Sequence, residues 1–160
     1  MKENILISTG GSGGHVVPAQ TLYEHLKDEF NVFLTSDLRG SKFFENNNKN
    51  FKIINVLPLT QNIFLLPWRI AIFFFSILKS FTYLKSKKIK TIISTGGYMS
   101  LPICISAKIL NLKVILFEPN LVLGRSNLFF LNYCSSILCY SEEIRNFPIK
   151  LKKKIKLISP

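Results

Sequence analysis

The sequence Ile-Leu-Ile-Ser-Thr-Gly-Gly-Ser-Gly-Gly-His occupies residues 5–15, and its five residues from Ile7 to Gly11 recur unchanged at Ile93 to Gly97. Each copy ends an apolar run and precedes helix-compatible sequence, which predicts a buried strand, a glycine turn and a helix start. Two such turns at the carboxyl edge of one parallel sheet face a single crevice. Because glycine lets backbone approach a ligand closely and helix starts favour anions, the repeat predicts a polar, phosphorylated ligand.

The rest of the chain alternates short apolar strands with helical stretches. Strands are predicted at Ile5–Ser8, Val32–Thr35, Lys52–Val56, Thr91–Ser94, Val114–Phe117 and Ile137–Tyr140, with a last candidate at Ile155–Ile158. Helices are predicted at Pro18–Glu29, Leu65–Lys85, Leu101–Leu110, Leu123–Cys134 and Glu142–Phe147. This order predicts an α/β fold, a Rossmann-like parallel sheet with helices on both faces. We expect residues 1–160 to form one domain.

Composition narrows the classes of partner. The chain is 48% hydrophobic with a mean hydropathy of +0.26, which argues against disorder. Its net charge of +12 suits nucleic acid, anionic lipid or phosphorylated ligands, although lysines placed at neutral surface positions by an AT-biased genome are an alternative source of the excess. The chain has neither zinc-finger spacing nor an aromatic RNA-binding signature, so nucleic acid is not expected as a partner.

The cysteines and the amino terminus indicate the compartment. Cys104, Cys134 and Cys139 are odd in number, sit in apolar sequence and lack metal-ligand spacing. They therefore predict buried thiols in a reducing compartment, and no metal site. The amino terminus runs directly into a short strand and does not resemble a signal peptide, so we expect a cytoplasmic protein.

The segment Ile63–Leu78 is almost wholly apolar, and lysines follow it. It is shorter than the roughly 20 residues that a membrane span needs, and it contains Arg69. On a helix, Arg69, Ser76, Lys79 and Ser80 would share one narrow side and leave the apolar side chains elsewhere. Either the helix lies on an anionic membrane surface, or it packs on the sheet as an ordinary crossover helix. The expected membrane patch comprises Trp68, Ile72, Phe74, Phe75 and Lys79.

The first glycine loop is a weak dinucleotide motif. It lacks the usual spacing, and the acidic residue expected after the second strand is only approximated by Asp37. His15 follows the four glycines directly. At a helix amino terminus the dipole disfavours a charged imidazole, so the ring is available as a neutral base or as a hydrogen-bond partner.

Three motifs in this order resemble the MurG family of GT-B glycosyltransferases (family 28), the UDP-N-acetylglucosamine (UDP-GlcNAc) transferases that complete the lipid-linked peptidoglycan precursor. Gly10–His15 resembles the first glycine loop, with Ser12 where threonine is usual, and Gly96–Ser100 with Pro102 resembles the second. The stretch Phe117-Glu118-Pro119-Asn120, followed by Gly124 and Asn127, is similar to the family's His-Glu-Gln-Asn segment. Phe117 and Pro119 depart from that pattern, so only Glu118 and Asn120 carry the family's roles.

The resemblance covers nearly all 160 residues and concerns only the amino-terminal, acceptor-binding half of the family. It implies that a carboxyl-terminal donor domain is absent from this chain, and that the chain is inactive alone. The implied reaction moves GlcNAc from UDP-GlcNAc, with inversion, to undecaprenyl-pyrophosphoryl-MurNAc-pentapeptide in peptidoglycan synthesis. No cofactor is implied, and the implied location is the inner face of the cell membrane.

The resemblance also implies site residues. Catalytic roles fall to His15, as general base, and to Glu118. The donor-binding residues are Ser12, Gly13, Gly14 and Asn120, and the acceptor-binding residues are Gly96, Gly97, Tyr98, Ser100 and Asn127. Three alternatives stay open: His15 only forms hydrogen bonds, Glu118 only orients the acceptor or the loops, and Asn127 is a buried structural amide.

Two other functions compete with this hypothesis. One is a non-catalytic, membrane-recruiting subunit of a split two-chain GlcNAc transferase, and the other is a small dinucleotide-binding oxidoreductase domain. Under the first hypothesis the partners are UDP-GlcNAc, the polyprenyl-pyrophosphate-linked acceptor, an anionic membrane surface, and a donor domain or subunit.

Overall fold

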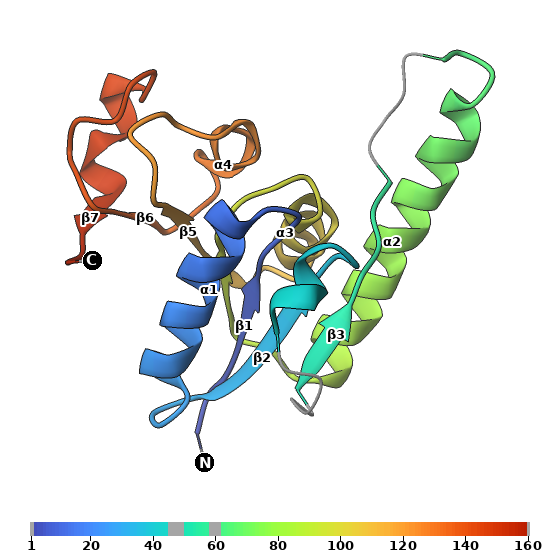
Figure 1. Cartoon of the computed structure of the whole chain (residues 1–160), viewed down its shortest axis with the longest axis horizontal. Coiled ribbons are helices and arrows are strands. Elements are labelled where there is room, and N and C mark those ends of the chain that lie inside the picture. The colour runs from blue at the N-terminus through green and yellow to red at the C-terminus, as the bar shows by residue number, and fades with distance from the viewer. Residues whose placement is uncertain (1, 45–49, 58–61, 160) are drawn as a thin grey trace.

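The computed structural model describes residues 2–44, 50–57 and 62–159. Within these ranges the strands form one seven-stranded sheet in the order β3-β2-β1-β4-β5-β6-β7, and all neighbouring strands are parallel (Figure 1). The strands are β1 (Asn4–Ser8), β2 (Asn31–Ser36), β3 (Phe51–Ile53), β4 (Thr91–Ser94), β5 (Lys113–Glu118), β6 (Ser136–Cys139) and β7 (Ile155–Leu157). Each one falls within a few residues of its predicted position, and the predicted fold class is confirmed.

Helices cover both faces of the sheet. They are α1 (Gly13–Leu26), α2 (Leu66–Ser86), α3 (Ser100–Ile109) and α4 (Arg125–Phe130), with 3₁₀ turns η1 (Gly40–Phe43) and η2 (Ile149–Lys154). Alternate residues of a strand point to opposite faces, so Ile5 and Ile7 pack under α1 while Leu6 packs under α2 and α3. Because both faces are covered, the central strands β1 and β4 are buried at nearly every position and have apolar residues in their middle, as the sequence indicated.

Helix α1 begins earlier than the sequence predicted. The prediction started the helix at Pro18, but the backbone becomes helical at Gly13. Ser12 is extended, and its carbonyl accepts hydrogen bonds from the N–H groups of His15 and Val16 at 3.0 and 3.1 Å. The glycine loop therefore forms the first turn of the helix, which places His15 inside that turn.

The helix predicted at Glu142–Phe147 is wrong. The Arg145 N–H donates to the Leu121 carbonyl at 2.8 Å, and the Leu123 N–H donates to the Arg145 carbonyl at 3.3 Å. Asn146 then takes a left-handed conformation with φ of 63°. The backbone groups that a helix would need are thus bonded to the loop before α4, and the bond at Leu123 accounts for the start of α4 at Arg125 instead of at Leu123.

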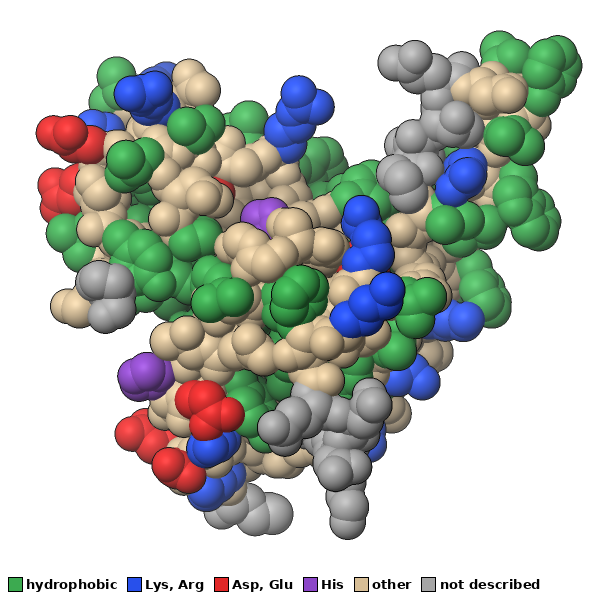
Figure 2. All heavy atoms as spheres, viewed as in Figure 1, with side chains coloured by type: hydrophobic (Ala, Val, Ile, Leu, Met, Phe, Trp, Pro, Cys, Tyr) green, Lys and Arg blue, Asp and Glu red, His purple; other side chains and the backbone are tan. Residues whose placement is uncertain are grey.

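Helix α2 faces the fold with the narrow side that carries Ser76 and Ser80. Ser76 and Ser80 are buried, and the Ser106 hydroxyl of α3 donates to the Ile77 carbonyl at 2.9 Å, so small polar side chains lie where α2 meets the fold. Apolar side chains are exposed instead, among them Trp68, Phe74, Phe75 and Leu78. Figure 2 shows hydrophobic side chains gathered over the projecting end of α2.

The members of the expected membrane patch differ in exposure. Ile72 is half-buried, whereas Trp68, Phe74, Phe75 and Lys79 are exposed, and the Lys79 ammonium lies 4.6 Å from the centre of the Phe75 ring. A helical wheel cannot tell which side of an almost wholly apolar helix meets the fold, because close packing against α3 selects small residues. No helix in the described part of the chain is both long and apolar enough to span a bilayer.

All three cysteines are buried free thiols, as predicted. Burial raises the pKa of the Cys104 and Cys139 thiols to about 12, and the charge of Glu118 adds to the effect at Cys139. These thiols stay protonated, so they serve as packing residues of the core.

Candidate functional site

The two glycine loops meet at the carboxyl edge of the sheet. β1 and β4 are neighbours with Ser8 opposite Ser94, and a Cβ added to Gly97 would lie 3.4 Å from the Gly10 carbonyl oxygen. Gly96 and Gly97 have φ values of +92° and +84°, a region that favours glycine. The expectation of one shared crevice is confirmed, and it is divided into two cavities.

The larger cavity, of about 380 Å³, lies between the second glycine loop and α4. Its walls combine a polar floor with an apolar and cationic rim. The lining residues are His15, Gly96, Gly97, Tyr98, Leu101, Glu118, Gly124, Arg125, Ser126, Asn127 and Phe129.

The smaller cavity, of about 220 Å³, lies beside the first glycine loop. It is lined by Gly10, Gly11, Ser12, His15, Asp37, Arg39, Gly97, Tyr98 and Met99. His15, Gly97 and Tyr98 contribute to both cavities, so His15 stands at the boundary between them.

His15 is half-buried in the first turn of α1. Its ring packs on the second loop, because its Cε1 atom is 3.3 Å from the position that a Cβ on Gly96 would take. Nδ1 is buried without a hydrogen-bond partner among the described residues. A buried, unpaired ring nitrogen at a cavity boundary is suited to a ligand or to proton transfer.

Glu118 is only 2% exposed and both its carboxylate oxygens are engaged. Oε1 accepts hydrogen bonds from the Asn120 N–H at 3.3 Å and from Asn120 Nδ2 at 3.0 Å. Oε2 accepts from the Gly124 N–H at 2.7 Å and from Asn127 Nδ2 at 3.0 Å. This arrangement ties the loop after β5 to the start of α4, which favours an orienting role for Glu118.

Asn127 is also 2% exposed, and its amide orientation is determined by its partners. Nδ2 donates to the Phe117 carbonyl at 3.1 Å and to Glu118 Oε2 at 3.0 Å. A flipped amide would set oxygen against these two acceptors, so Oδ1 must face the other way. Oδ1 is buried without a partner among the described residues. Asn127 is thus a structural amide in the wall of the larger cavity, with one buried acceptor that has no partner among the described residues.

The other predicted site residues differ in burial and in their hydrogen-bond partners. Ser100 is buried, its hydroxyl donates to the Gly97 carbonyl at 2.7 Å, and it lines neither cavity. Asn120 is exposed at the cavity edge and bonded to Glu118. Ser12 is exposed, and its hydroxyl does not cap α1. At Gly13 and Gly14 an added Cβ would meet no atom of the described residues within 4 Å.

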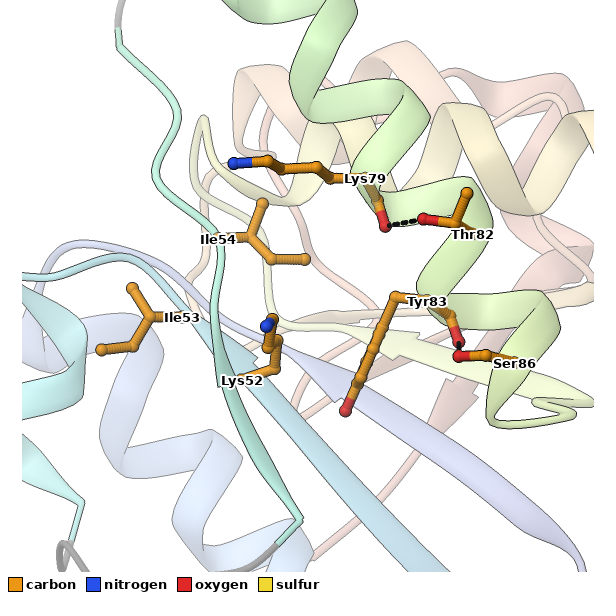
Figure 3. A pocket seen from close by; sticks show the side chains of 7 residues that line it. All are labelled: Lys52, Ile53, Ile54, Lys79, Thr82, Tyr83 and Ser86. Carbon is orange, nitrogen blue, oxygen red and sulfur yellow. Dashed lines mark hydrogen bonds between the residues drawn. The ribbon is translucent and has the colours of Figure 1, made fainter.

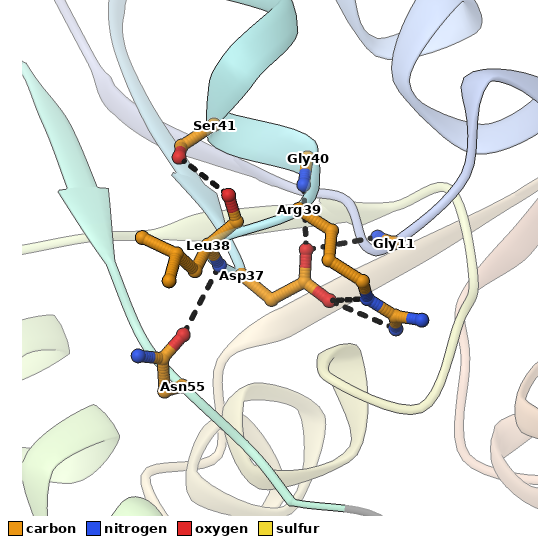
Figure 4. A network of polar contacts seen from close by, with 7 residues as sticks. All are labelled: Gly11, Asp37, Leu38, Arg39, Gly40, Ser41 and Asn55. Atoms are coloured by element: carbon orange, nitrogen blue, oxygen red, sulfur yellow. Dashed lines mark hydrogen bonds and ion pairs between the residues drawn. The ribbon is translucent and has the colours of Figure 1, made fainter.

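Asp37 organises the first glycine loop (Figure 4). Its Oδ1 accepts hydrogen bonds from the N–H groups of Gly11 at 3.1 Å and Gly40 at 2.7 Å, while Oδ2 accepts from the Arg39 guanidinium. Burial raises the pKa of Asp37, but these hydrogen bonds and the charge of Arg39 together hold that pKa below its ordinary value of 3.8. A carboxylate bonded in this way is not available to a nucleotide ribose, which argues against the dinucleotide alternative.

Sequence reasoning missed several residues of the two cavities. Arg125, Ser126 and Phe129 line the larger cavity from α4, Leu101 lines it from α3, and Arg39 lines the smaller one. The only signal for Arg125 and Ser126 was their position between Gly124 and Asn127 of the third motif. Phe129 and Leu101 gave no signal, because the sequence offers many similar apolar residues.

A third hollow, of about 400 Å³, lies between the edge strand β3 and α2 (Figure 3). It is lined by Lys52, Ile53, Ile54, Lys79, Thr82, Tyr83 and Ser86. The Thr82 and Ser86 hydroxyls donate to carbonyls of their own helix, and burial raises the pKa of Tyr83 to about 12. None of the predicted catalytic, donor-binding or acceptor-binding residues lines this hollow.

Comparisons with known proteins identify relatives of this chain. Residues 5–139 match the model of the glycosyltransferase family 28 N-terminal domain. A Pelagibacter ubique protein named UDP-N-acetylglucosamine--N-acetylmuramyl-(pentapeptide) pyrophosphoryl-undecaprenol N-acetylglucosamine transferase is 56% identical over 158 residues, which are 99% of this chain and 44% of that protein. A Rickettsia prowazekii protein of the same name is 38% identical over 161 residues, covering 98% of this chain and 40% of its own length.

Solved structures show the same fold. Acinetobacter baumannii MurG matches with a TM-score of 0.81 and 18% identity, over 97% of this chain and 45% of that structure. S. aureus MnaA, in its UDP co-structure, matches with a TM-score of 0.71 and 10% identity, over 97% of this chain and 43% of that structure. The chain therefore spans less than half the length of the relatives that it matches.

Proposed function

The chain belongs to glycosyltransferase family 28 through that family's N-terminal domain, and on this premise we propose that it forms the acceptor-binding half of an inverting N-acetylglucosaminyltransferase. The reaction moves GlcNAc from UDP-GlcNAc to undecaprenyl-pyrophosphoryl-MurNAc-pentapeptide, as in the names of its relatives. The donor site is completed by a carboxyl-terminal domain, on the same chain or on another.

The position of His15 between the two cavities carries this proposal. A transferase must bring a donor and an acceptor together at one proton-accepting group. The smaller cavity adjoins the start of α1, and the larger cavity adjoins the second loop and α4. We assign the donor diphosphate to the smaller cavity and the acceptor to the larger cavity.

In the proposed reaction the acceptor hydroxyl attacks the anomeric carbon of GlcNAc. The bond from that carbon to the UDP oxygen breaks with inversion, and a ring nitrogen of His15 takes the hydroxyl proton. Glu118 is a positioning residue in this scheme, because its hydrogen bonds to Asn120, Gly124 and Asn127 hold the cavity wall. A general base of this kind contributes about 10² to 10⁴ in rate.

The amino terminus of α1 supports the donor assignment. The first N–H groups of a helix lack intrahelical partners and favour an anion. Gly13 and Gly14 present these groups with open space around them, and the chain itself requires no glycine at either position. Glycine in a helix costs about 1 kcal/mol relative to alanine, so we assign the two glycines to close approach of the donor.

The exposed face of α2 supports the proposal that the chain binds a membrane surface. Trp68 is 66% exposed and Phe74 is 62% exposed. Phe73, the neighbour of Phe74 on this helix, lies 6.0 Å from Tyr98 between ring centres, and Tyr98 lines both cavities. An apolar route thus links the acceptor site to α2, which fits an acceptor anchored by a polyprenyl chain at the inner face of the cell membrane.

The test joins this chain to the carboxyl-terminal remainder of the Pelagibacter ubique relative. Transfer of labelled GlcNAc from UDP-GlcNAc to a short-chain acceptor analogue is then measured. We expect the joined protein to be active and His15→Ala to lower kcat by about 10² to 10⁴ with a small change in KM for UDP-GlcNAc. His25→Ala is the matched control, because His25 is exposed on the same helix.

Each other outcome is informative. Retained turnover in His15→Ala would exclude the base role. A joined protein that binds the acceptor analogue and vesicles but transfers no sugar would favour the non-catalytic, membrane-recruiting subunit instead. Binding of NADH by the chain alone would revive the oxidoreductase alternative.

A further inference from the structure

We propose that Arg125 and Phe129 form a subsite for a diphosphate that carries an apolar chain, at the rim of the larger cavity. Arg125 binds the diphosphate and Phe129 contacts the first units of the chain. This inference rests on the proposed function, since it deepens the acceptor assignment of that cavity.

The first observation is that the guanidinium of Arg125 has no carboxylate partner among the described residues. Among the described residues the ion pairs are Lys27 with Glu24 and Arg39 with Asp37, so Arg125 is paired with no carboxylate there. Glu118, the carboxylate of the same cavity, already accepts hydrogen bonds on both oxygens. The exposed Arg125 guanidinium is therefore available, and its planar fork matches phosphate oxygens.

The second observation is the unpaired acceptor of Asn127. Its Oδ1 is buried and has no partner among the described residues, whereas buried polar atoms are as a rule hydrogen-bonded. We assign the missing donor to the ligand. A diphosphate at neutral pH offers no N–H and few O–H groups, so the donor must belong to a polar group attached to it. A hydroxyl or acetamido N–H of a sugar meets this requirement, which directs the sugar towards Asn127 and His15.

The third observation concerns the other end of the ligand. Phe129 is 71% exposed, yet its ring makes an edge contact with the buried Phe130 at 5.0 Å between ring centres. It is thus a supported apolar surface, and Leu101 is a further apolar residue that lines the same cavity. Arg125 and Phe129 are four residues apart on α4 and share one face of the helix. A cation and an aromatic ring side by side match a diphosphate joined to an apolar chain.

The test is calorimetric titration of the chain with inorganic pyrophosphate and with geranyl diphosphate. We expect Arg125→Gln to weaken binding of both probes about tenfold, as for the loss of a charge-assisted hydrogen bond, and Arg125→Lys to restore part of the affinity. Phe129→Ser should weaken geranyl diphosphate several-fold and leave pyrophosphate unchanged, because only the former buries apolar surface against the ring.

Two control variants match these changes. Lys113→Gln removes the same charge at the start of β5, which is the opposite edge of the sheet. Leu128→Ser removes an exposed apolar side chain that does not line the cavity. Both should bind the two probes as the unsubstituted chain does, and urea unfolding checks that every variant is folded.

Some results would overturn the proposal. If the unsubstituted chain binds the probes and Arg125→Gln binds them equally well, the subsite is wrong while the proposed function stands. If Arg39→Gln abolishes binding instead, the diphosphate lies in the smaller cavity. If the unsubstituted chain binds neither probe, the acceptor assignment fails together with the subsite.

Discussion

The Cε1 atom of His15 lies 3.3 Å from the position that a Cβ on Gly96 would take. The first glycine loop thus supplies the ring, and the second supplies the only kind of residue that leaves room for it. This contact explains why the two loops, which start from the same five residues, are not interchangeable. The first carries His15, which we propose as the general base, and the second provides the surface against which its ring packs.

Gly96→Ala should destabilise the fold by about 1–3 kcal/mol, because Gly96 has φ of +92° and the new Cβ would press on His15 and on the Ser126 hydroxyl. Urea unfolding measures the loss. In an active, joined protein the same change should lower kcat, since it displaces the imidazole. Unfolding at the same urea concentration as the unsubstituted chain would show that the contact carries no strain.

Gly13→Ala and Gly14→Ala should leave stability unchanged or raise it by up to about 1 kcal/mol, since both positions are helical and open. Binding of UDP-GlcNAc to the joined protein should nevertheless weaken several-fold, because the new methyl groups occupy the space assigned to the donor. Urea unfolding and calorimetric titration give the two readings. Unchanged UDP-GlcNAc affinity in both variants would contradict the donor assignment.

Glu118→Gln should cost about 1–3 kcal/mol of unfolding free energy, although it changes little in size. The carboxylate accepts hydrogen bonds on both oxygens, and an amide would turn an N–H₂ group towards two of those donors. Glu142→Gln, at an exposed position, is the control. Equal stability of the two variants would mean that Glu118 does not hold the loop.

Asp37→Asn should destabilise the chain most near neutral pH. The folded-state pKa of Asp37 lies below the ordinary value of 3.8, so the charged form is favoured by folding. Its contribution is complete above that value and is lost as the pH falls through the folded-state pKa. Urea unfolding at about pH 7 and about pH 3 should therefore show a smaller difference between variant and unsubstituted chain at the lower pH. Asp28→Asn, at an exposed position, is the control.

Phe74→Ser together with Phe75→Ser should reduce co-sedimentation with anionic vesicles, because both rings are exposed on α2 beside Lys79. Ile109→Ser is the matched control, since Ile109 is exposed at the far end of α3. Raising the salt concentration should also weaken the binding of the unsubstituted chain to anionic vesicles, because salt screens the attraction between lysines and anionic lipids. Sedimentation that is unchanged in the double variant would exclude this face as the membrane contact.

Much of the fold follows from local patterns in the sequence. Short apolar runs such as Thr91–Ser94 predicted each strand, because strands covered on both faces contain few polar residues. The helix predicted at Glu142–Phe147 failed for a non-local reason. Arg145 bonds to Leu121 and Leu123, residues that lie far enough away along the chain for no local pattern to reveal the pairing.

Local sequence patterns also did not reveal which side of α2 faces the fold. Its composition predicted an almost wholly apolar helix, but only packing against α3 decided that Ser76 and Ser80 turn inward and that Trp68, Phe74 and Phe75 stay exposed. The roles proposed for Arg125 and Phe129 could not be predicted from the sequence for a related reason. Isolated charged and aromatic residues acquire a role only when the fold places them at the same cavity.

The sequence by itself determined a parallel α/β domain with two glycine turns at one sheet edge and a histidine in the first, because strand periodicity and glycine geometry act over a few residues. The tertiary structure decided that His15 rests on Gly96, that both oxygens of Glu118 accept hydrogen bonds from the following loop and from α4, and that Asn127 Oδ1 has no partner among the described residues. These are contacts between separate segments, and their partners are selected by close packing and by the pairing of buried polar groups.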